Sequence, residues 1–264
     1  FNISADDLAD FIEGNPKNLG KRVFWKILIS SQLDADRGDY LLRDSLHIGV
    51  KYGVYDLERL LVSVALGIDP ESEDVTLGIR EGGRYVAEAL IIARYQMFSQ
   101  VYFHKTRRAF DKMYQEAIVS KSNILPSPEG EELTKFLKLD DYEMWQWLKN
   151  SDDNYWCRSI KTRDHIRRIR EIRGIPTPED DEKLSSWMKI LDDEGIWYWV
   201  DESPRVWYDT NRHEKGNKEI MIVTKDQSTS PLSERSPIVK NIGDVRQIRL
   251  YVKPEDRERA EKMV

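Results

Sequence analysis

Hydrophobic residues recur along the first 195 positions at the three- and four-residue spacing typical of amphipathic helices. This pattern predicts helices over residues 5–31 (with a break near "GNPKN"), 34–48, 54–66, 84–101, 106–121 and 140–150. The basic stretch "IKTRDHIRRIREIRG" (160–174) is predicted to form a helix closed by Gly174 and Pro176, and an acidic helix is expected over 178–195. Residues 122–132 are predicted to form a loop.

Strand patterns are confined to one internal run and to the C-terminal part. The alternating run 75–79 lies between turn residues and predicts a small hairpin, and "IWYWV" (196–200), "EIMIVT" (219–224) and "VRQIRLYV" (245–252) predict strands before a terminal helix. The expected fold is mainly α: a helical body with one β-hairpin, divided at 1–125 and 126–195, and a small α+β appendage at 196–264.

Composition narrows the class of protein. The chain has 264 residues, of which 40% are hydrophobic and 33% charged, which indicates a globular protein, and no apolar run approaches the ~20 residues of a membrane span. The net charge of −6 argues against wholesale nucleic-acid binding. The single cysteine, Cys157, excludes an internal disulfide framework and favours a reducing cytoplasm. A start at Phe1 with a helix almost at once suggests a piece of a longer protein.

One predicted helix combines an apolar side with side chains suited to chemistry. On a helix over 34–48, the residues Asp36, Tyr40, Asp44 and His47 fall within an arc of about 80°. Outside this arc lie Leu41, Leu42, Leu46 and Ile48, with Gly38 and Ser45 as small packing positions. An ordinary solvated face would favour Lys and Glu, so two carboxylates, a phenol and an imidazole in a row indicate a site.

Three stretches carry a resemblance to a known family. "LDADRGDYLLRDSLHIGVKYGVYDLERLL" resembles the "DxDRxDYLxRDxxxxGxxxGxxDxxRLL" segment of HD-domain phosphohydrolases, in the branch of bacterial dNTP triphosphohydrolases and the human SAM-and-HD-domain dNTPase. "ARYQMFSQVYFHKTRRAFDKM" resembles the later helix of that branch, in which an Arg and a Tyr lie eight residues apart, and "LSERSPIVKNI" resembles its C-terminal appendage.

The resemblance implies an activity and a set of site residues. It implies hydrolysis of a deoxynucleoside triphosphate to deoxynucleoside and triphosphate, with a divalent metal ion (Mg, Mn, Fe or Zn) that lowers the pKa of bound water. The implied roles are metal ligation and catalysis by Asp36, phosphate binding by Arg37 and Arg94, sugar contacts by Tyr40 and Tyr102, and acceptance of a hydrogen bond from the 3′-hydroxyl by Asp44.

The same resemblance implies partners and leaves alternatives open. The other metal ligands of the family are a His and a His-Asp dipeptide, whereas the histidines here are His47, His104, His165 and His213, with no His-Asp dipeptide. We therefore expect an upstream HD segment to complete the site, and self-association as a dimer or tetramer. The alternatives are a non-catalytic nucleotide-sensing or scaffold subunit, and nucleic-acid binding through the seven Lys or Arg between Arg158 and Arg173.

Overall fold

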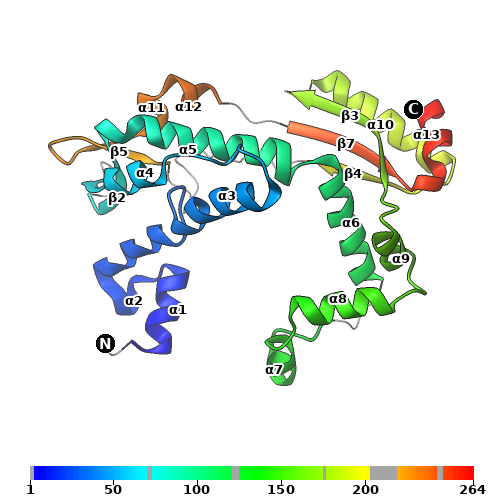
Figure 1. Ribbon diagram of the computed structural model, residues 1–264, viewed down its shortest axis with the longest axis horizontal. Helices are drawn as coiled ribbons and strands as arrows, with labels where there is room; N and C mark the ends of the chain where they lie inside the picture. Colours follow the sequence, from blue (N-terminus) through cyan, green and yellow to red (C-terminus); the bar gives the residue numbers. More distant parts are fainter. Residues whose placement is uncertain (1–2, 70–72, 121–124, 175–176, 203–218, 243–245) are drawn as a thin grey trace. The chain divides into compact units, whose positions relative to one another are not determined.

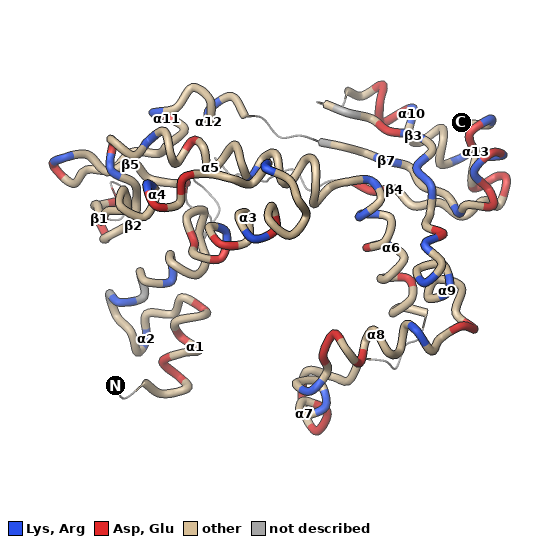
Figure 2. The backbone as a smooth tube through the Cα atoms, viewed as in Figure 1, with Lys and Arg blue, Asp and Glu red and all other residues tan. Residues whose placement is uncertain are grey.

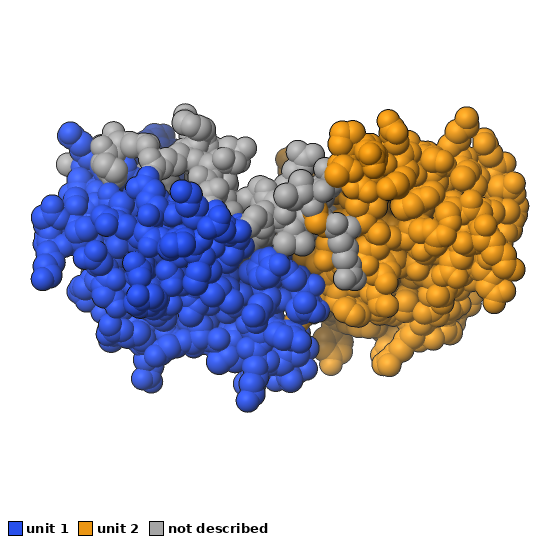
Figure 3. All heavy atoms as spheres, turned by 90° about the horizontal axis from the view of Figure 1, so that it is seen from above, with its two compact units in different colours: residues 1–100, 206–244 blue, residues 101–205, 245–264 orange. Residues whose placement is uncertain are grey.

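The protein forms two compact units, each built from separated parts of the chain. The computed structural model describes residues 3–69, 73–120, 125–174, 177–202, 219–242 and 246–264. Unit 1 comprises Phe1–Gln100 and Val206–Asp244, and unit 2 comprises Val101–Arg205 and Val245–Val264 (Figure 3). Each unit includes a piece of the C-terminal part of the chain, and the division into 1–125, 126–195 and 196–264 stays a prediction.

Helices dominate both units, and the mainly α fold class is confirmed (Figure 1). Unit 1 contains α1 (Ala5–Glu13), α2 (Pro16–Leu19), the 3-10 helix η1 (Gly20–Leu28), α3 (Ala35–Ile48), α4 (Leu57–Ser63), β1 (Val64–Ile68), β2 (Val75–Arg80), the 3-10 turn η2 (Glu81–Gly83), α5 (Arg84–Met97), β5 (Met221–Val223), β6 (Thr229–Pro231), α11 (Leu232–Arg235) and α12 (Pro237–Asn241). The π-helical segment η3 (Phe98–Tyr102) follows α5.

Unit 2 consists of the remaining elements. These are α6 (Lys105–Val119), the 3-10 turn η4 (Gly130–Glu132), α7 (Leu133–Phe136), α8 (Asp141–Asn150), α9 (Tyr155–Thr162), β3 (Arg167–Gly174), α10 (Pro178–Asp193), β4 (Tyr198–Glu202), β7 (Arg246–Val252), the 3-10 turn η5 (Pro254–Asp256) and α13 (Arg257–Met263). None of the described helices has both the length and the apolar character that a membrane crossing needs.

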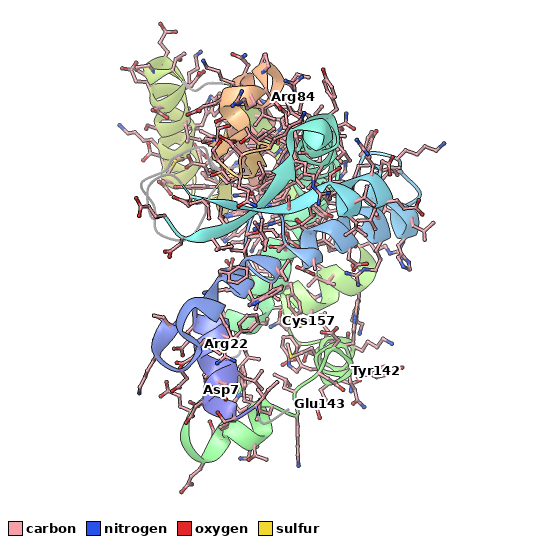
Figure 4. All side chains as sticks on the ribbon, turned by 90° about the vertical axis from the view of Figure 1, so that its left-hand side faces the viewer. Asp7, Arg22, Arg84, Tyr142, Glu143 and Cys157 are labelled. Atoms are coloured by element: carbon pink, nitrogen blue, oxygen red, sulfur yellow. The ribbon has the colours of Figure 1, made fainter. Side chains whose placement is uncertain are left out.

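The core of unit 1 is organised around α5. This helix buries apolar side chains on several sides, namely Val86, Ala87, Leu90, Ile91, Ala93 and Met97. The predicted hairpin forms between β1 and β2, and β2 pairs in parallel with β5, which gives a sheet of order β1-β2-β5-β6. At the start of α5, Arg84 donates from Nη1 to the carbonyl of Arg235 at 3.3 Å, so α11 is tied to this helix (Figure 4).

Unit 2 is built on a sheet of order β3-β7-β4 with helices on both faces. Neighbouring residues of the central strand β7 point to opposite faces, as the two-residue period of a strand requires. Leu250 and Val252 pack with Leu191 of α10 and Ala260 of α13. Tyr251 packs on the other face with Met113 of α6 and its neighbours.

The basic helix predicted over 160–174 is wrong in its second half. The helix α9 ends at Thr162, and residues Arg167–Gly174 form strand β3 instead. The isoleucines at 166, 169 and 172 repeat every three residues, which imitates a helix, but the register of β3 against β7 shifts between Arg168 and Arg170. This irregularity adds a residue to the strand, so β-branched residues three apart still reach buried positions.

Two other helix boundaries differ from the prediction. The helix expected over 54–66 ends at Ser63, because the β-branched and small residues after it form β1 against β2. The helix expected over 84–101 changes to π-helical turns at Phe98, where aromatic, Ser and Val residues replace strong helix formers. Of the loop expected at 122–132, residues 122–124 lie outside the described residues.

Candidate functional site

The helix α3 begins and ends at residues with clear capping chemistry. Asp34 is the N-cap, and its side chain accepts a 2.7 Å hydrogen bond from the backbone N–H of Arg37. Gly49 ends the helix with φ +77, a left-handed conformation that suits glycine. The predicted helix over 34–48 is therefore confirmed to within one residue.

A narrow line of small and apolar residues holds α3 in unit 1. Gly38, Leu41 and Ser45 are buried. The Tyr55 hydroxyl donates a 2.8 Å hydrogen bond to the carbonyl of Gly38, so the segment after α3 packs along the same line. Leu46, which was expected outside the polar arc on the apolar side, is 80% exposed.

Two other apolar residues of α3 are also less buried than the predicted orientation of the helix indicates. Ile48 is exposed and Leu42 is only half-buried, so the packed side of the helix is narrower than its hydrophobic pattern indicates. Gly38 and Ser45 allow neighbouring segments to approach α3 closely, through Tyr55, Gly53 and Met97.

The other side of α3 carries the polar residues selected from the sequence. Asp36 is exposed in the first turn, where a carboxylate also complements the helix dipole. Arg37 is partly buried, and its Nη1 lies 3.2 Å from Oδ2 of Asp34. Tyr40 and Asp44 follow at one-turn intervals and are half-buried.

Arg94 of α5 reaches the same neighbourhood from a distant part of the chain. Burial raises the pKa of Tyr40, while the positive charges of Arg94 and Arg37 act against this rise, so both guanidinium groups lie near the phenol. Arg94 is 8% exposed, and its guanidinium lies 5.8 Å from the centre of the Phe98 ring. The structure thus brings Arg37, Tyr40 and Arg94 together with Asp34 and Asp36.

Tyr102 belongs to the other unit. It ends η3, and its carbonyl accepts a 2.5 Å hydrogen bond from Nη1 of Arg107. The resembling branch has its Arg and Tyr eight residues apart on one helix, whereas here α5 changes to π-helical geometry at Phe98, between Arg94 and Tyr102. The sugar contact that the resemblance implies for Tyr102 stays a prediction.

The polar contacts of this region include two residues that the sequence analysis missed. Asp34 was expected only as the start of a helix. Its carboxylate caps the helix by accepting from the backbone N–H of Arg37, and it also pairs with the Arg37 guanidinium. Gln32 is 2% exposed, and its side-chain oxygen accepts a hydrogen bond from Nη1 of Arg94. A capping pattern could have identified Asp34. No local pattern could have identified Gln32, because its partner lies 62 residues away.

The residues that the structure describes do not make a complete metal centre. Among the described residues, no three His, Cys, Asp or Glu side chains come together in a way that could hold a metal ion. Asp36 has the oxygen donors that a hard or borderline divalent ion accepts, but one carboxylate is fewer than the usual three or so protein ligands. Of the histidines, His213 lies outside the described residues.

The basic stretch of β3 is engaged with neighbouring carboxylates and carbonyls. Arg168 pairs with Glu171, and Arg170 donates to the carbonyls of Glu261 and Val264 in α13 and the residue after it. Arg167 lies 3.3 Å from Asp164. Figure 2 shows these basic positions along β3 and the acidic start of α10 in the same unit. The helical basic surface that motivated the nucleic-acid alternative is therefore not formed by residues 167–174.

Comparison with known proteins identifies the family. Residues 55–264 match the family model described as the HD associated region. An uncharacterised protein of Methanocaldococcus jannaschii is 34% identical over 155 residues, which cover 59% of this chain and 32% of that protein. The uncharacterised protein YwfO of Bacillus subtilis is 29% identical over 263 residues, with 91% of this chain and 58% of YwfO covered.

Solved structures share the fold. A hypothetical protein from Aquifex aeolicus superposes with a TM-score of 0.77 and 24% identity, over 98% of this chain and 65% of its own. A phosphohydrolase from Bacteroides thetaiotaomicron superposes with a TM-score of 0.64 and 21% identity, over 94% of this chain and 67% of its own. The chain spans about a third of the length of the Methanocaldococcus jannaschii protein and somewhat more than half of the length of YwfO. Because the family model covers most of the sequence, this chain belongs to the HD associated region family.

Proposed function

We propose that this chain carries the substrate-binding part of an HD-family phosphohydrolase that converts deoxynucleoside triphosphates to deoxynucleoside and triphosphate. The family and the fold shared with a phosphohydrolase from Bacteroides thetaiotaomicron support a hydrolase of this superfamily. The observation that carries the proposal is the meeting of Arg37 and Arg94 beside Tyr40, with Asp36 one turn away on α3.

The chemistry of these side chains suits a polyphosphate attached to a sugar. Two guanidinium groups can grip phosphate oxygens with paired hydrogen bonds. The half-buried Tyr40 offers an apolar ring surface for a sugar, and Asp44, one turn further along α3, offers an acceptor for a hydroxyl. A sugar contact by Tyr102, at the end of η3, stays an expectation from the resemblance.

A divalent metal ion, Mg, Mn, Fe or Zn, is part of the proposal. In the intact protein Asp36 would provide one of its ligands and an upstream HD segment the others. The ion would neutralise phosphate charge and activate water. The described residues alone provide no full ligand set for this ion. Self-association as a dimer or tetramer stays a prediction, which light scattering can test.

The test compares two carboxylates of the same helix. Asp36→Asn should abolish triphosphate release from the dNTPs in the intact protein with Mg or Mn, because an amide is a poor ligand for these ions. Asp39→Asn is the matched control, since Asp39 is exposed three residues further along and pairs on the surface with Arg43 at 2.9 Å. We expect the control to retain full activity.

Each other outcome has a clear meaning. Full activity of Asp36→Asn would remove Asp36 from the site. Nucleotide binding without turnover by the intact protein would replace the hydrolase with the nucleotide-sensing or scaffold subunit. Addition of an upstream HD segment to this chain should restore metal affinity and turnover together.

A further inference from the structure

The hydrogen bond between Gln32 and Arg94 joins two segments of unit 1 that are far apart in the sequence. Gln32 lies in the turn before α3, and Arg94 lies in the last turn of α5. Both side chains are almost fully buried, at 2% and 8% exposure. A contact of this kind fixes the direction of the guanidinium, because five donors on a planar group leave little freedom once one of them is held.

The acceptor in this hydrogen bond is a neutral amide rather than a carboxylate. Removal of a charge from water is costly, so proteins commonly place a carboxylate against a buried guanidinium. Unit 2 contains such a pair: Arg249 is 4% exposed and donates from Nε to Glu171 at 2.9 Å. Gln32 orients Arg94 without adding a negative charge, so this contact does not itself reduce the positive charge that an anionic ligand would meet.

The electrostatic surroundings of Tyr40 agree with this reading. The Arg94 charge is the largest single charge acting on the Tyr40 phenol, ahead of Arg37, Asp34 and Asp36. Its positive charge therefore reaches the polar side of α3, where Asp36 begins the candidate site.

We infer that Gln32 is a positioning residue: it holds the Arg94 guanidinium toward the phosphates of the substrate and preserves its charge for them. This inference rests on the proposed function and adds a determinant of phosphate affinity that lies outside the predicted site residues. It predicts that the charge at position 32, more than the hydrogen bond itself, controls the affinity for the substrate.

The decisive variant is Gln32→Glu in the intact protein. A carboxylate has nearly the same shape as the amide and forms a stronger hydrogen bond to a guanidinium, so the melting temperature should stay the same or rise. The added negative charge should compete with the phosphates of the substrate. We expect KM for the dNTP to rise at least tenfold with a much smaller change in kcat, since phosphate binding is lost equally in the ground and transition states.

Two further variants separate positioning from a merely structural role. Tyr55→Phe removes another buried hydrogen bond, from Tyr55 to the Gly38 carbonyl, and should lower the melting temperature while leaving KM unchanged. In an Arg94→Ala background, Gln32→Glu should have little additional effect on KM, because residues that act through one another are not additive. Calorimetric titration of the same variants with inorganic triphosphate should give the same order of affinities.

The possible failures are distinguishable. An active wild-type protein whose KM is unchanged in Gln32→Glu would overturn the role of Gln32 and leave the proposed function standing. An equal rise of KM in the Arg94→Ala background would overturn it as well, because the effect would then not pass through Arg94. A wild-type protein that neither binds triphosphate nor hydrolyses any dNTP would overturn both.

Discussion

The Ser45 hydroxyl in α3 accepts a 2.9 Å hydrogen bond from the backbone N–H of Gly53, so the loop after α3 folds back against the helix. The same hydroxyl lies 3.4 Å from the sulfur of Met97 in α5. One small polar side chain therefore joins α3, its following loop and the central helix of unit 1. The candidate site depends on this junction, because Asp36, Tyr40 and Arg94 lie on the two helices that it connects.

Gly53 should not tolerate a side chain. A Cβ atom at this position would lie 2.4 Å from the carbonyl oxygen of Leu41 and 2.5 Å from the Ser45 hydroxyl. Because backbone atoms cannot give way cheaply, we expect Gly53→Ala to lower the free energy of unfolding by ~1–3 kcal/mol. Urea unfolding measures this change. Gly82→Ala is the control, since a Cβ there meets nothing within 4 Å, and a larger loss for the control would contradict the packing described.

Two leucines of α3 should respond in opposite ways to truncation. Leu41 is fully buried, so Leu41→Ala should cost ~2–5 kcal/mol of stability through the cavity that it leaves. Leu46 is 80% exposed in this structure, so Leu46→Ala should change stability by less than about 0.5 kcal/mol. Chemical denaturation of both variants tests the orientation of the helix, and equal losses would show that another surface covers Leu46.

Asp44 should contribute to substrate affinity rather than to folding. Asp44→Ala should weaken deoxynucleotide binding in the intact protein by ~1.5–3 kcal/mol, the scale of a charge-assisted hydrogen bond. Calorimetric titration with each dNTP gives the affinity, and a melting curve of the same variant separates loss of binding from loss of structure. Unchanged affinity would remove Asp44 from the set of site residues.

The sequence determines much of this region because its residues act locally. The motif shared with HD-domain phosphohydrolases contains positions whose roles are capping and close packing: Asp34 begins α3, Gly49 ends it, and Asp56 begins α4. Such roles follow from residue type and spacing. The mainly α class and the strand over 75–79 were predictable for the same reason, whereas the start of β1 was expected to be the end of a helix.

What the sequence could not supply depends on contacts between distant segments. The partner of Gln32 is set by the packing of α5. The strand β3 is set by its pairing with β7, which starts at Arg246, 79 residues after the start of β3 at Arg167. The isoleucine spacing in β3 fits a helix until the irregular register is known. Leu46 and Ile48 show the same limit, since a hydrophobic pattern does not say which of its members will find a neighbour.

Unit 2 should depend on a buried group of charges. Arg249 donates to Glu171 at 2.9 Å and to the carbonyl of Phe103 at 2.6 Å, and its Nη1 lies 3.6 Å from Asp201. Arg249→Ala would leave the buried Asp201 and the partly buried Glu171 without this cation, so we expect a loss of ~3–5 kcal/mol in unfolding free energy. Arg257→Ala, which breaks an exposed pair with Glu261, should cost less than about 1 kcal/mol in the same denaturation experiment. Similar losses in both variants would contradict the burial of the Arg249 group.

The stability of unit 1 should fall at high pH through Tyr55. Burial, with a smaller contribution from the Asp39 carboxylate, raises the pKa of Tyr55 to about 12 in the folded protein. An unfolded tyrosine titrates near 10. The folded state therefore favours the protonated phenol, which donates to the Gly38 carbonyl at 2.8 Å.

The sign follows from proton linkage. The folded pKa lies above the unfolded one, so the contribution of Tyr55 is fully present below pH ~10 and is lost as the pH rises toward about 12. We expect the unfolding free energy of the wild type to fall more steeply over this range than that of Tyr55→Phe, which has no phenol to ionise. Urea unfolding at half-unit pH steps gives the unfolding free energy of both proteins. The contributions of the other tyrosines cancel in the difference between them. Parallel curves for the two proteins would show that the Tyr55 hydroxyl is not held by Gly38 in solution.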